Sequence, residues 1–219
     1  MRRWIREHGL ASALFGAFGV FLVAQSLTGW HAHNEDLKDH GRMSIGYSTY
    51  LTTGHFVEAT FENWESEFLQ MAAFVLLTTR LVQKGSPESR RRGVVESFDA
   101  DPRAHRDAPG APWPVRRGGL ALALYEHSLS LTLLLLFAGS WVGHLLGGYA
   151  EFRGEALTHG QAVPTLAAYA WSPRLWFESL QNWQSEFLSI AAMVWLAVYL
   201  RERGSPESKA VHASHDDHD

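Results

Sequence analysis

The sequence predicts an all-α, polytopic membrane protein with four transmembrane helices, arranged as two tandem hairpins of a parallel repeat, and with short extracytoplasmic helices. Three observations predict this class: two long uncharged apolar stretches, two shorter apolar runs, and an internal duplication. The averages hide the pattern, because 46% hydrophobic and 19% charged residues over 219 positions are typical of a soluble protein. The apolar residues must therefore be concentrated in parts of the chain.

Two stretches without a charged residue are long enough to cross a bilayer. Residues 10–30 and 129–149 each cover 21 positions, which is about 30 Å of helix, the thickness of the hydrocarbon core. Two shorter runs reach that length only if the NWESE and NWQSE segments before them lie in the headgroup region. The predicted spans are residues 10–30, 64–82, 127–149 and 183–201.

The basic residues predict which ends of the spans face the cytoplasm. Of the 19 Lys and Arg residues, 15 lie before the first span, at or between the second and third, or after the fourth, beginning with Arg2, Arg3 and Arg6. The other four lie in residues 31–60 and 150–180. Because loops rich in Lys and Arg stay in the cytoplasm, both termini are predicted to be cytoplasmic, and residues 31–60 and 150–180 are predicted to be outer loops.

An internal duplication without gaps organises the chain. A shift of 119 residues aligns residues 7–90 with residues 126–209, with 27 identities in 84 positions. The clearest matches are NWESEFLQMAA with NWQSEFLSIAA and the two copies of GSPES. Each unit holds two spans, so both units have the same orientation in the membrane, as in a parallel repeat.

Glycine and proline predict where the helices begin and end. Gly41 and Gly160 should end helices that continue the first span of each unit above the membrane. Thr53-Gly54 and Ser172-Pro173 should begin the following helices, and Gly85 and Gly204 should end them. The predicted organisation is repeat 1 at 1–90, a flexible cytoplasmic linker at 91–118, repeat 2 at 119–209, and a disordered His/Asp tail at 210–219.

The doubled NWxSEFL and GSPES motifs resemble those of an uncharacterised bacterial family of four-span membrane proteins, a domain of unknown function. The resemblance covers essentially the whole chain. It implies a multi-pass protein of the bacterial inner membrane. It implies no activity, substrate or catalytic residue.

A layer of polar residues is predicted just below the outer aromatic belt. On the second helix of each unit, polar residues follow an i, i+4, i+7 pattern and share a face. Polar groups in hydrocarbon usually face the bundle interior. One hypothesis is a proton-sensitive or cation-binding vestibule; the other is that the carboxylates lie in the headgroup zone and fix helix depth. The candidates are Asn63, Ser66, Glu67, Asn182, Ser185, Glu186, Gln25 and His144.

Two further sets of residues are weak candidates for metal ligands. Glu7-His8 and Glu126-His127 offer oxygen and nitrogen donors that suit zinc, manganese or iron, although adjacent helical residues point about 100° apart, so capping of a span is the favoured interpretation. The histidines of the tail, His212, His215 and His218, form another weak metal-binding pattern.

Close helix packing is expected at Gly139, Gly143 and Gly147, against a helix of the same chain or of a second copy.

Three function classes remain open. The sequence contains no cysteine and no GxxxxGK[ST], HExxH or GxSxG motif, so no catalytic residue and no cofactor beyond a divalent metal is predicted. The first expectation is a non-enzymatic membrane protein with a structural, envelope or partner-binding role. The alternatives are a small-ion or proton carrier or channel that uses the polar layer, and a membrane metalloenzyme. The expected partners are the lipid bilayer and, through the glycines or the outer loops, a second copy or another membrane protein; no nucleic acid is expected.

Overall fold

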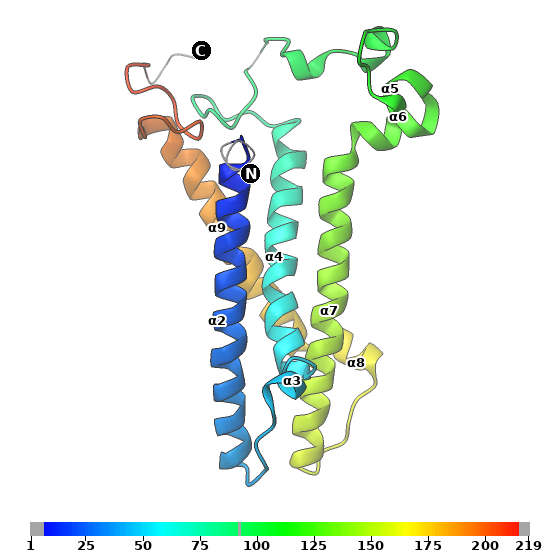
Figure 1. Ribbon diagram of the computed structural model, residues 1–219, viewed down its shortest axis with the longest axis vertical. Helices are drawn as coiled ribbons and strands as arrows, with labels where there is room; N and C mark the ends of the chain where they lie inside the picture. The colour runs from blue at the N-terminus through cyan, green and yellow to red at the C-terminus, as the bar shows by residue number, and fades with distance from the viewer. Residues whose placement is uncertain (1–6, 92, 215–219) are drawn as a thin grey trace. The chain divides into compact units, whose positions relative to one another are not determined.

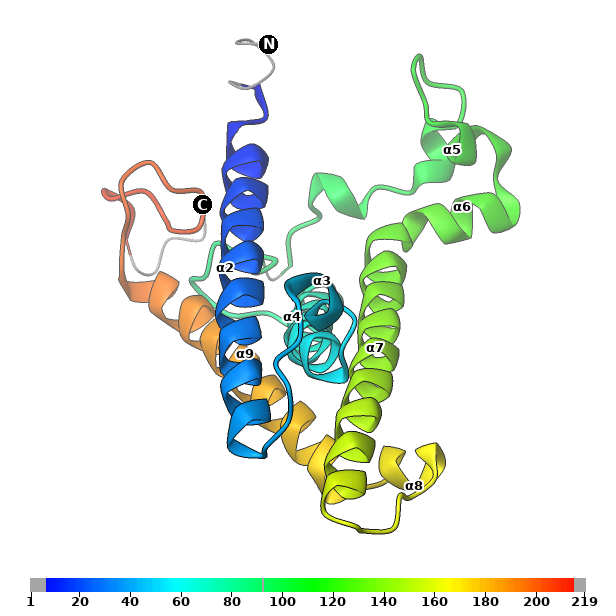
Figure 2. The ribbon, with the colours of Figure 1, turned by 60° about the horizontal axis from the view of Figure 1, so that its bottom comes forward.

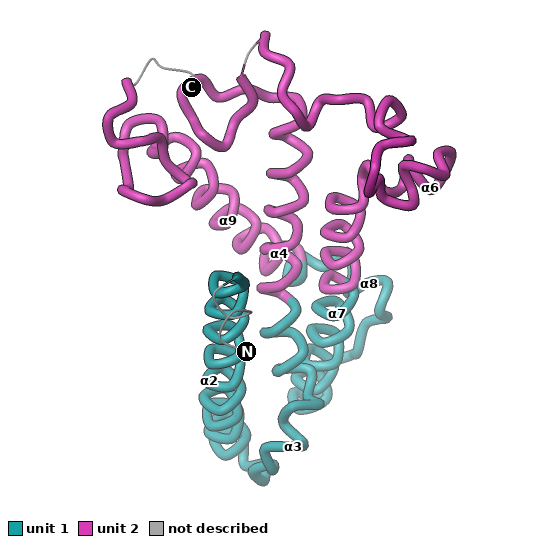
Figure 3. Tube along the Cα trace, turned by 45° about the horizontal axis from the view of Figure 1, so that its top comes forward, with its two compact units in different colours: residues 1–61, 142–175 teal, residues 62–141, 176–219 magenta. Residues whose placement is uncertain are grey.

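The computed structural model describes residues 7–91 and 93–214, and all regular secondary structure in these ranges is helical. Arg2, Arg3, Arg6, His215 and His218 lie outside the described residues. Two compact units are seen in Figure 3: residues 1–61 with 142–175, and residues 62–141 with 176–219. We call them unit 1 and unit 2.

Unit 1 contains the helices that carry the candidate site. It includes all of α2 (Gly9–Asp39), α3 (Tyr47–Tyr50) and α8 (Leu166–Ala170), and parts of α4 (Gly54–Thr78), α7 (Ser128–Thr158) and α9 (Pro173–Tyr199) (Figure 1). Of these, α2 and α7 are long and apolar enough to cross a membrane. This finding supports two spans. The four spans and the hairpin order predicted from the sequence stay predictions.

The helices α2 and α7 end where the sequence predicts. Gly41 and Gly160 take positive φ values of 67° and 62°, a conformation that is easily reached by glycine. The next residue then closes the helix end in each case, since Arg42 N donates to Leu37 O at 2.8 Å and Gln161 N donates to Ala156 O at 2.8 Å. The apolar stretches therefore continue as helix for about two turns beyond Trp30 and Tyr149.

Residues 119 positions apart make matching contacts in unit 1. Trp30 Nε1 donates to Ile45 O at 2.8 Å, and Tyr149 OH donates to Pro164 O at 3.0 Å. These bonds tie the loops before α3 and α8 to α2 and α7, and α8 lies beside the end of α7 (Figure 2). A further matched pair consists of Tyr50 and Tyr169, whose side chains are 2% and 1% exposed.

The helices α4 and α9 begin as predicted but end early. Each start is capped by a hydroxyl, because Phe56 N donates to Thr53 Oγ1 at 3.3 Å and Leu175 N donates to Ser172 Oγ at 3.4 Å. Their ends at Thr78 and Tyr199 precede the predicted ends at Gly85 and Gly204.

The GSPES motifs explain the early ends. Ser89 Oγ accepts from Gln83 N at 2.6 Å, and Ser208 Oγ accepts from Glu202 N at 2.9 Å. These backbone groups are bound within a loop and not within a helix, which is how serine competes with helical hydrogen bonding. The prediction that glycine ends the helices was therefore wrong for this pair, although both glycines have a φ of 87° within the loop.

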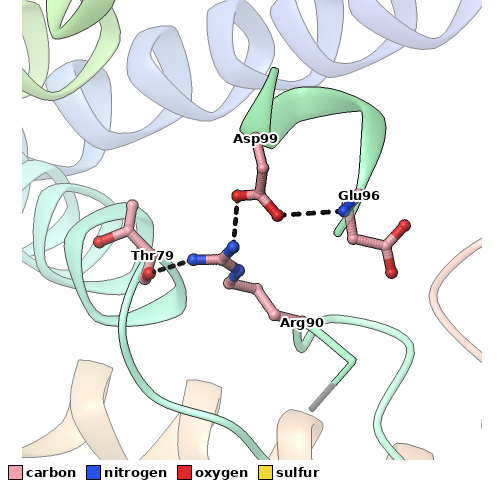
Figure 4. A network of polar contacts seen from close by, with 4 residues as sticks. All are labelled: Thr79, Arg90, Glu96 and Asp99. Carbon is pink, nitrogen blue, oxygen red and sulfur yellow. Dashed lines mark hydrogen bonds and ion pairs between the residues drawn. The ribbon is translucent and has the colours of Figure 1, made fainter. Parts of the chain in front are cut away.

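Unit 2 contains the segment predicted as a linker. Short helices occur there: η1 (Ser97–Asp99), η2 (Pro102–His105) and α5 (Trp113–Arg117), followed by α6 (Gly119–Glu126). Arg90 joins the end of α4 to η1, because its guanidinium donates to Thr79 O at 2.7 Å and pairs with Asp99 (Figure 4). A backbone hydrogen bond from Glu96 and the charge of Arg90 lower the pKa of Asp99.

Candidate functional site

The start of α4 packs directly against the glycine-rich part of α7 within unit 1. A Cβ atom on Gly147 would lie 2.5 Å from Glu58 N, and one on Gly54 would lie 2.6 Å from Glu151 N. A Cβ on Gly143 would lie 2.5 Å from the Phe61 ring, whereas nothing lies within 4 Å of the corresponding point on Gly139. The glycines at 143 and 147 therefore meet a helix of the same chain, and their lack of a side chain permits the backbone contact.

This contact buries an acidic and a basic side chain together. Glu58 of α4 is 8% exposed and His144 of α7 is 0% exposed. A carboxylate oxygen of Glu58 and a ring nitrogen of His144 lie within 4.8 Å of each other. Burial of ionisable groups costs free energy unless they are paired, so the two groups are expected to stabilise each other's charged or hydrogen-bonded form.

A third polar side chain reaches the same place from α8. Gly148 of α7 leaves room for it, because a Cβ there would collide with the Tyr169 hydroxyl and would lie 2.9 Å from Glu58 Oε1. The carboxylate and the phenol therefore approach the same point above the α7 backbone. Three elements, α4, α7 and α8, together bring a carboxylate, an imidazole and a phenol into a buried cluster, which we call the Glu58 cluster.

The chemistry of the Glu58 cluster suits a small cation. A carboxylate and an imidazole exchange a proton readily near neutral pH. The same donors, oxygen and nitrogen, are those that bind zinc, manganese or iron. A phenol beside the carboxylate can orient it by hydrogen bonding, as residues around a binding site commonly do.

The contact between a tyrosine and a glycine of the cluster occurs twice in unit 1, but the acid and the base do not recur at the matching positions of the sequence. Tyr50 covers Gly29 as Tyr169 covers Gly148. The position matching His144 holds Gln25, whose Nε2 donates to Ala59 O at 3.4 Å, and the position matching Glu58 holds Phe177. The contact between tyrosine and glycine therefore forms whether or not these two positions hold an acid and a base.

The predicted polar layer is divided between the units. Gln25 and His144 belong to unit 1, whereas Asn63, Ser66, Glu67, Asn182, Ser185 and Glu186 belong to unit 2. Within unit 2, Asn63, Glu67 and Ser185 are exposed, whereas Ser66 is buried. Ser66 and Ser185 bond to carbonyls one turn earlier, Asn63 O at 2.8 Å and Asn182 O at 3.0 Å, so both hydroxyls are used locally.

Unit 2 holds two carboxylates that sequence reasoning missed, the half-buried Glu62 and the buried Glu65. Asn182 Nδ2 donates to Glu62 Oε1 at 2.5 Å, and Trp183 Nε1 donates to Glu65 Oε1 at 3.1 Å. The NWQSE motif therefore binds acids of α4 other than Glu67. Glu67 instead lies close enough to Glu186 for their charges to repel each other.

A periodic signal for these hydrogen-bonded and buried acids was present in the sequence. Glu58, Glu62 and Glu65 follow the same i, i+4, i+7 spacing as Asn63, Glu67 and Gln70, but on another face of α4. Glu58 was overlooked because it falls in the predicted outer loop. Tyr169 could not be predicted because its position depends on how α8 folds back onto α7.

The weak metal candidates from the sequence are exposed at the starts of helices or between them. Glu7 and His8 are exposed at the start of α2 in unit 1, and Glu126 and His127 are exposed between α6 and α7 in unit 2. Among the residues that the structure describes, none of the four belongs to a group close enough to hold a metal ion.

Comparison with known proteins identifies the family. No curated protein and no solved structure matches the chain. The family model described as a domain of unknown function, DUF6766, matches residues 1–219. The motifs predicted an uncharacterised family, and over its whole length the chain belongs to the DUF6766 family of unknown function.

Proposed function

We propose that the chain is a multi-pass protein of the bacterial inner membrane, with four spans in two repeated hairpins and cytoplasmic termini. The length and apolar character of α2 and α7 support the membrane location. So does the exposure of large apolar side chains on α2, such as Leu10 at 78% and Phe15 at 77%, because exposed apolar surface of this kind fits a lipid environment. The matched hydrogen bonds at positions 119 apart support the duplication.

Within this framework, the proposed activity is the carriage of a small cation through the outer half of the bundle. The observation that carries it is the burial of Glu58 against His144 inside unit 1. Ionisable residues at membrane depth are costly and are usually kept for a pathway or a relay. In this role Glu58 supplies the negative charge, His144 accepts or releases a proton, and Tyr169 orients the carboxylate.

The absence of both ionisable groups from the duplicated scaffold favours this role over packing alone. Gln25 and Phe177 stand at the matching positions, so the contact between tyrosine and glycine recurs where the positions matching Glu58 and His144 are not ionisable. Burial of Glu58 and His144 costs free energy that the recurring contact between tyrosine and glycine does not require, and a binding role accounts for them.

The test is a flux assay on the full chain in proteoliposomes, with trapped dyes that report protons and Zn²⁺. We expect wild-type vesicles to move a cation and Glu58→Gln with His144→Asn to reduce the rate at least about tenfold, since charged transmembrane ligands are rarely replaceable. Glu67→Gln with Glu186→Gln serves as the matched control, because it removes two carboxylates outside the Glu58 cluster and should leave the rate unchanged.

The outcomes separate the other two classes. Wild-type vesicles that move neither protons nor Zn²⁺ would overturn the carrier proposal and leave the structural, envelope or partner-binding role. A stoichiometric metal that stays bound without crossing the bilayer would favour the metalloenzyme alternative, in which the Glu58 cluster holds the ion.

A further inference from the structure

A second group of histidines and acids lines a cavity in unit 1. The cavity has a volume of about 460 Å³ and lies between the Gly41 end of α2 and the Gly160 end of α7. We call it the histidine cavity. Its ionisable lining is His33, Asp36, His40, Glu151, Glu155 and His159, together with Arg42.

These donors come from two helix faces that face one another. His33, Asp36 and His40 have i, i+3, i+7 spacing and share a face of α2. Glu151, Glu155 and His159 have i, i+4, i+8 spacing at the end of α7, and the hydrogen bond from His159 N to Glu155 O at 3.0 Å extends the helical pattern to the histidine.

The α7 face of the cavity continues the face that carries the buried pair. Counting from His144, Glu151 and Glu155 are i+7 and i+11, two and three turns farther along the same side of the helix. Gly148 lies between His144 and Glu151 in the sequence and leaves room for the Glu58 carboxylate. A row of ionisable groups therefore runs along α7 from the cavity to the Glu58 cluster.

Two imidazoles lie across the cavity from each other. The ring centroids of His40 and His159 are 6.0 Å apart, in an edge-to-face arrangement. A metal ion bound at about 2.0–2.1 Å by two imidazole nitrogens holds the rings about 5–6 Å apart, which is close to the observed separation of the ring centroids.

The ring of His40 is already oriented. Its Nδ1 lies 2.9 Å from Asp36 O and 3.4 Å from Asp36 Oδ1. Histidines that bind metals usually donate one ring N–H to a carbonyl or carboxylate and coordinate through the other nitrogen. This arrangement leaves Nε2 as the coordinating atom of His40.

A second histidine pair lies deeper in unit 1. The rings of His33 and His55 are 4.9 Å apart, and Tyr50 OH lies 3.1 Å from His55 Nδ1. Burial lowers the pKa of His55, although the nearby Glu151 carboxylate acts in the opposite direction.

From these contacts we propose that the histidine cavity captures a divalent first-row transition-metal ion, with His40 and His159 as ligands, Asp36 as the orienting group and water in the remaining positions. The proposal rests on the proposed function, since it names the cation that the Glu58 cluster would receive. Imidazole nitrogen favours ions of the zinc class over alkali and alkaline-earth ions, which prefer oxygen alone. Only two protein ligands suit capture and release, because a closed four-ligand site would hold the ion.

The experiment titrates the full chain in detergent with Zn²⁺ by calorimetry. We expect two sites in the wild type, one in the cavity and one at the Glu58 cluster. His40→Ala with His159→Ala should remove the cavity site, with an affinity loss of at least about 100-fold. Glu58→Gln with His144→Asn should remove the other. His31→Ala is the matched control, because His31 is an exposed histidine of α2 that does not line the cavity.

Each possible failure points to a different proposal. A titration of His40→Ala with His159→Ala that matches the wild type overturns the cavity site, and so does competition by Ca²⁺ as effective as that by Zn²⁺. A double variant Glu58→Gln with His144→Asn that loses flux but still binds Zn²⁺ at the cavity as the wild type does would support the carrier proposal separately from the cavity site. If the double histidine variant does not fold, the single variants His40→Ala and His159→Ala decide, because each removes one ligand and should weaken the cavity site at least about tenfold, and an unchanged affinity in both overturns the proposal.

Discussion

At the scale of single residues, the duplicated tyrosines separate scaffold from chemistry. Tyr50 and Tyr169 are both buried and both cover a glycine, but they have different polar neighbours. Tyr50 approaches His55, whereas Tyr169 approaches the carboxylate of Glu58. A change that removes only the hydroxyl should therefore have different effects at the two positions.

We predict that Tyr169→Phe lowers the affinity of the Glu58 cluster for Zn²⁺ about 10- to 100-fold, the usual effect of removing a group that orients a ligand. Tyr50→Phe, which makes the same chemical change on the matching scaffold, should leave that affinity unchanged. Calorimetric titration of both variants measures the difference. Equal effects of the two substitutions would mean that the hydroxyls serve packing and not the site.

At the scale of helices, the sequence predicts a boundary that is set by the backbone preference of the residue at that boundary. It does not predict a boundary that is set by a hydrogen bond from a side chain several residues later in the chain. Gly41 and Ser172-Pro173 mark helix ends by their own backbone preferences. The ends of α4 and α9 depend on Ser89 and Ser208, which bind backbone groups six residues earlier. Glycine spacing likewise predicts close packing at Gly143 and Gly147, but cannot identify α4 as the helix that it meets.

The contact between α4 and α7 predicts a strong difference between two glycines of the same motif. Gly147→Ala places a Cβ against the backbone of Glu58 and should destabilise the protein by about 1–3 kcal/mol, as overpacking does. Gly139→Ala meets nothing within 4 Å and should be neutral or slightly stabilising, because alanine favours helix. Thermal unfolding in detergent compares the two, and equal melting temperatures would contradict the packing.

At the scale of the whole molecule, the 119-residue repeat predicts which positions should match but not which of them differ in chemistry. The alignment pairs Tyr50 with Tyr169 and Glu88 with Glu207 correctly as equivalent residues. It cannot show that Glu58 and His144 are buried together, because that depends on how segments far apart in sequence pack. Predicted membrane depth also misled the choice of acids, since Glu58 lies before the predicted second span and yet in the same helix.

The two GSPES loops of unit 2 bring matching acids into contact. A hydrogen bond with Glu207, together with burial and the negative charge of Glu207, raises the pKa of Glu88 to about 7. Two carboxyl groups bond to each other only while one is protonated, so the contact persists below about pH 7 and gives way to repulsion above it. Because the folded pKa lies above the ordinary value, this contribution to stability is present at low pH and is lost as the pH rises through about 7.

Spin labels on the two GSPES loops can measure whether the contact between Glu88 and Glu207 depends on pH. The labels can be attached at chosen positions because the chain has no cysteine of its own. Labels introduced by Lys84→Cys and Arg203→Cys, two matching exposed positions, should give one short distance at pH 6 and a longer or broader distribution at pH 8. Glu88→Gln should keep the short distance at both pH values, since an amide donates a hydrogen bond to Glu207 without a titrating proton. Glu202→Gln, at an exposed acid outside the pair, should behave as the wild type. A wild-type distribution that is the same at both pH values would show that the loops do not respond to the shared proton.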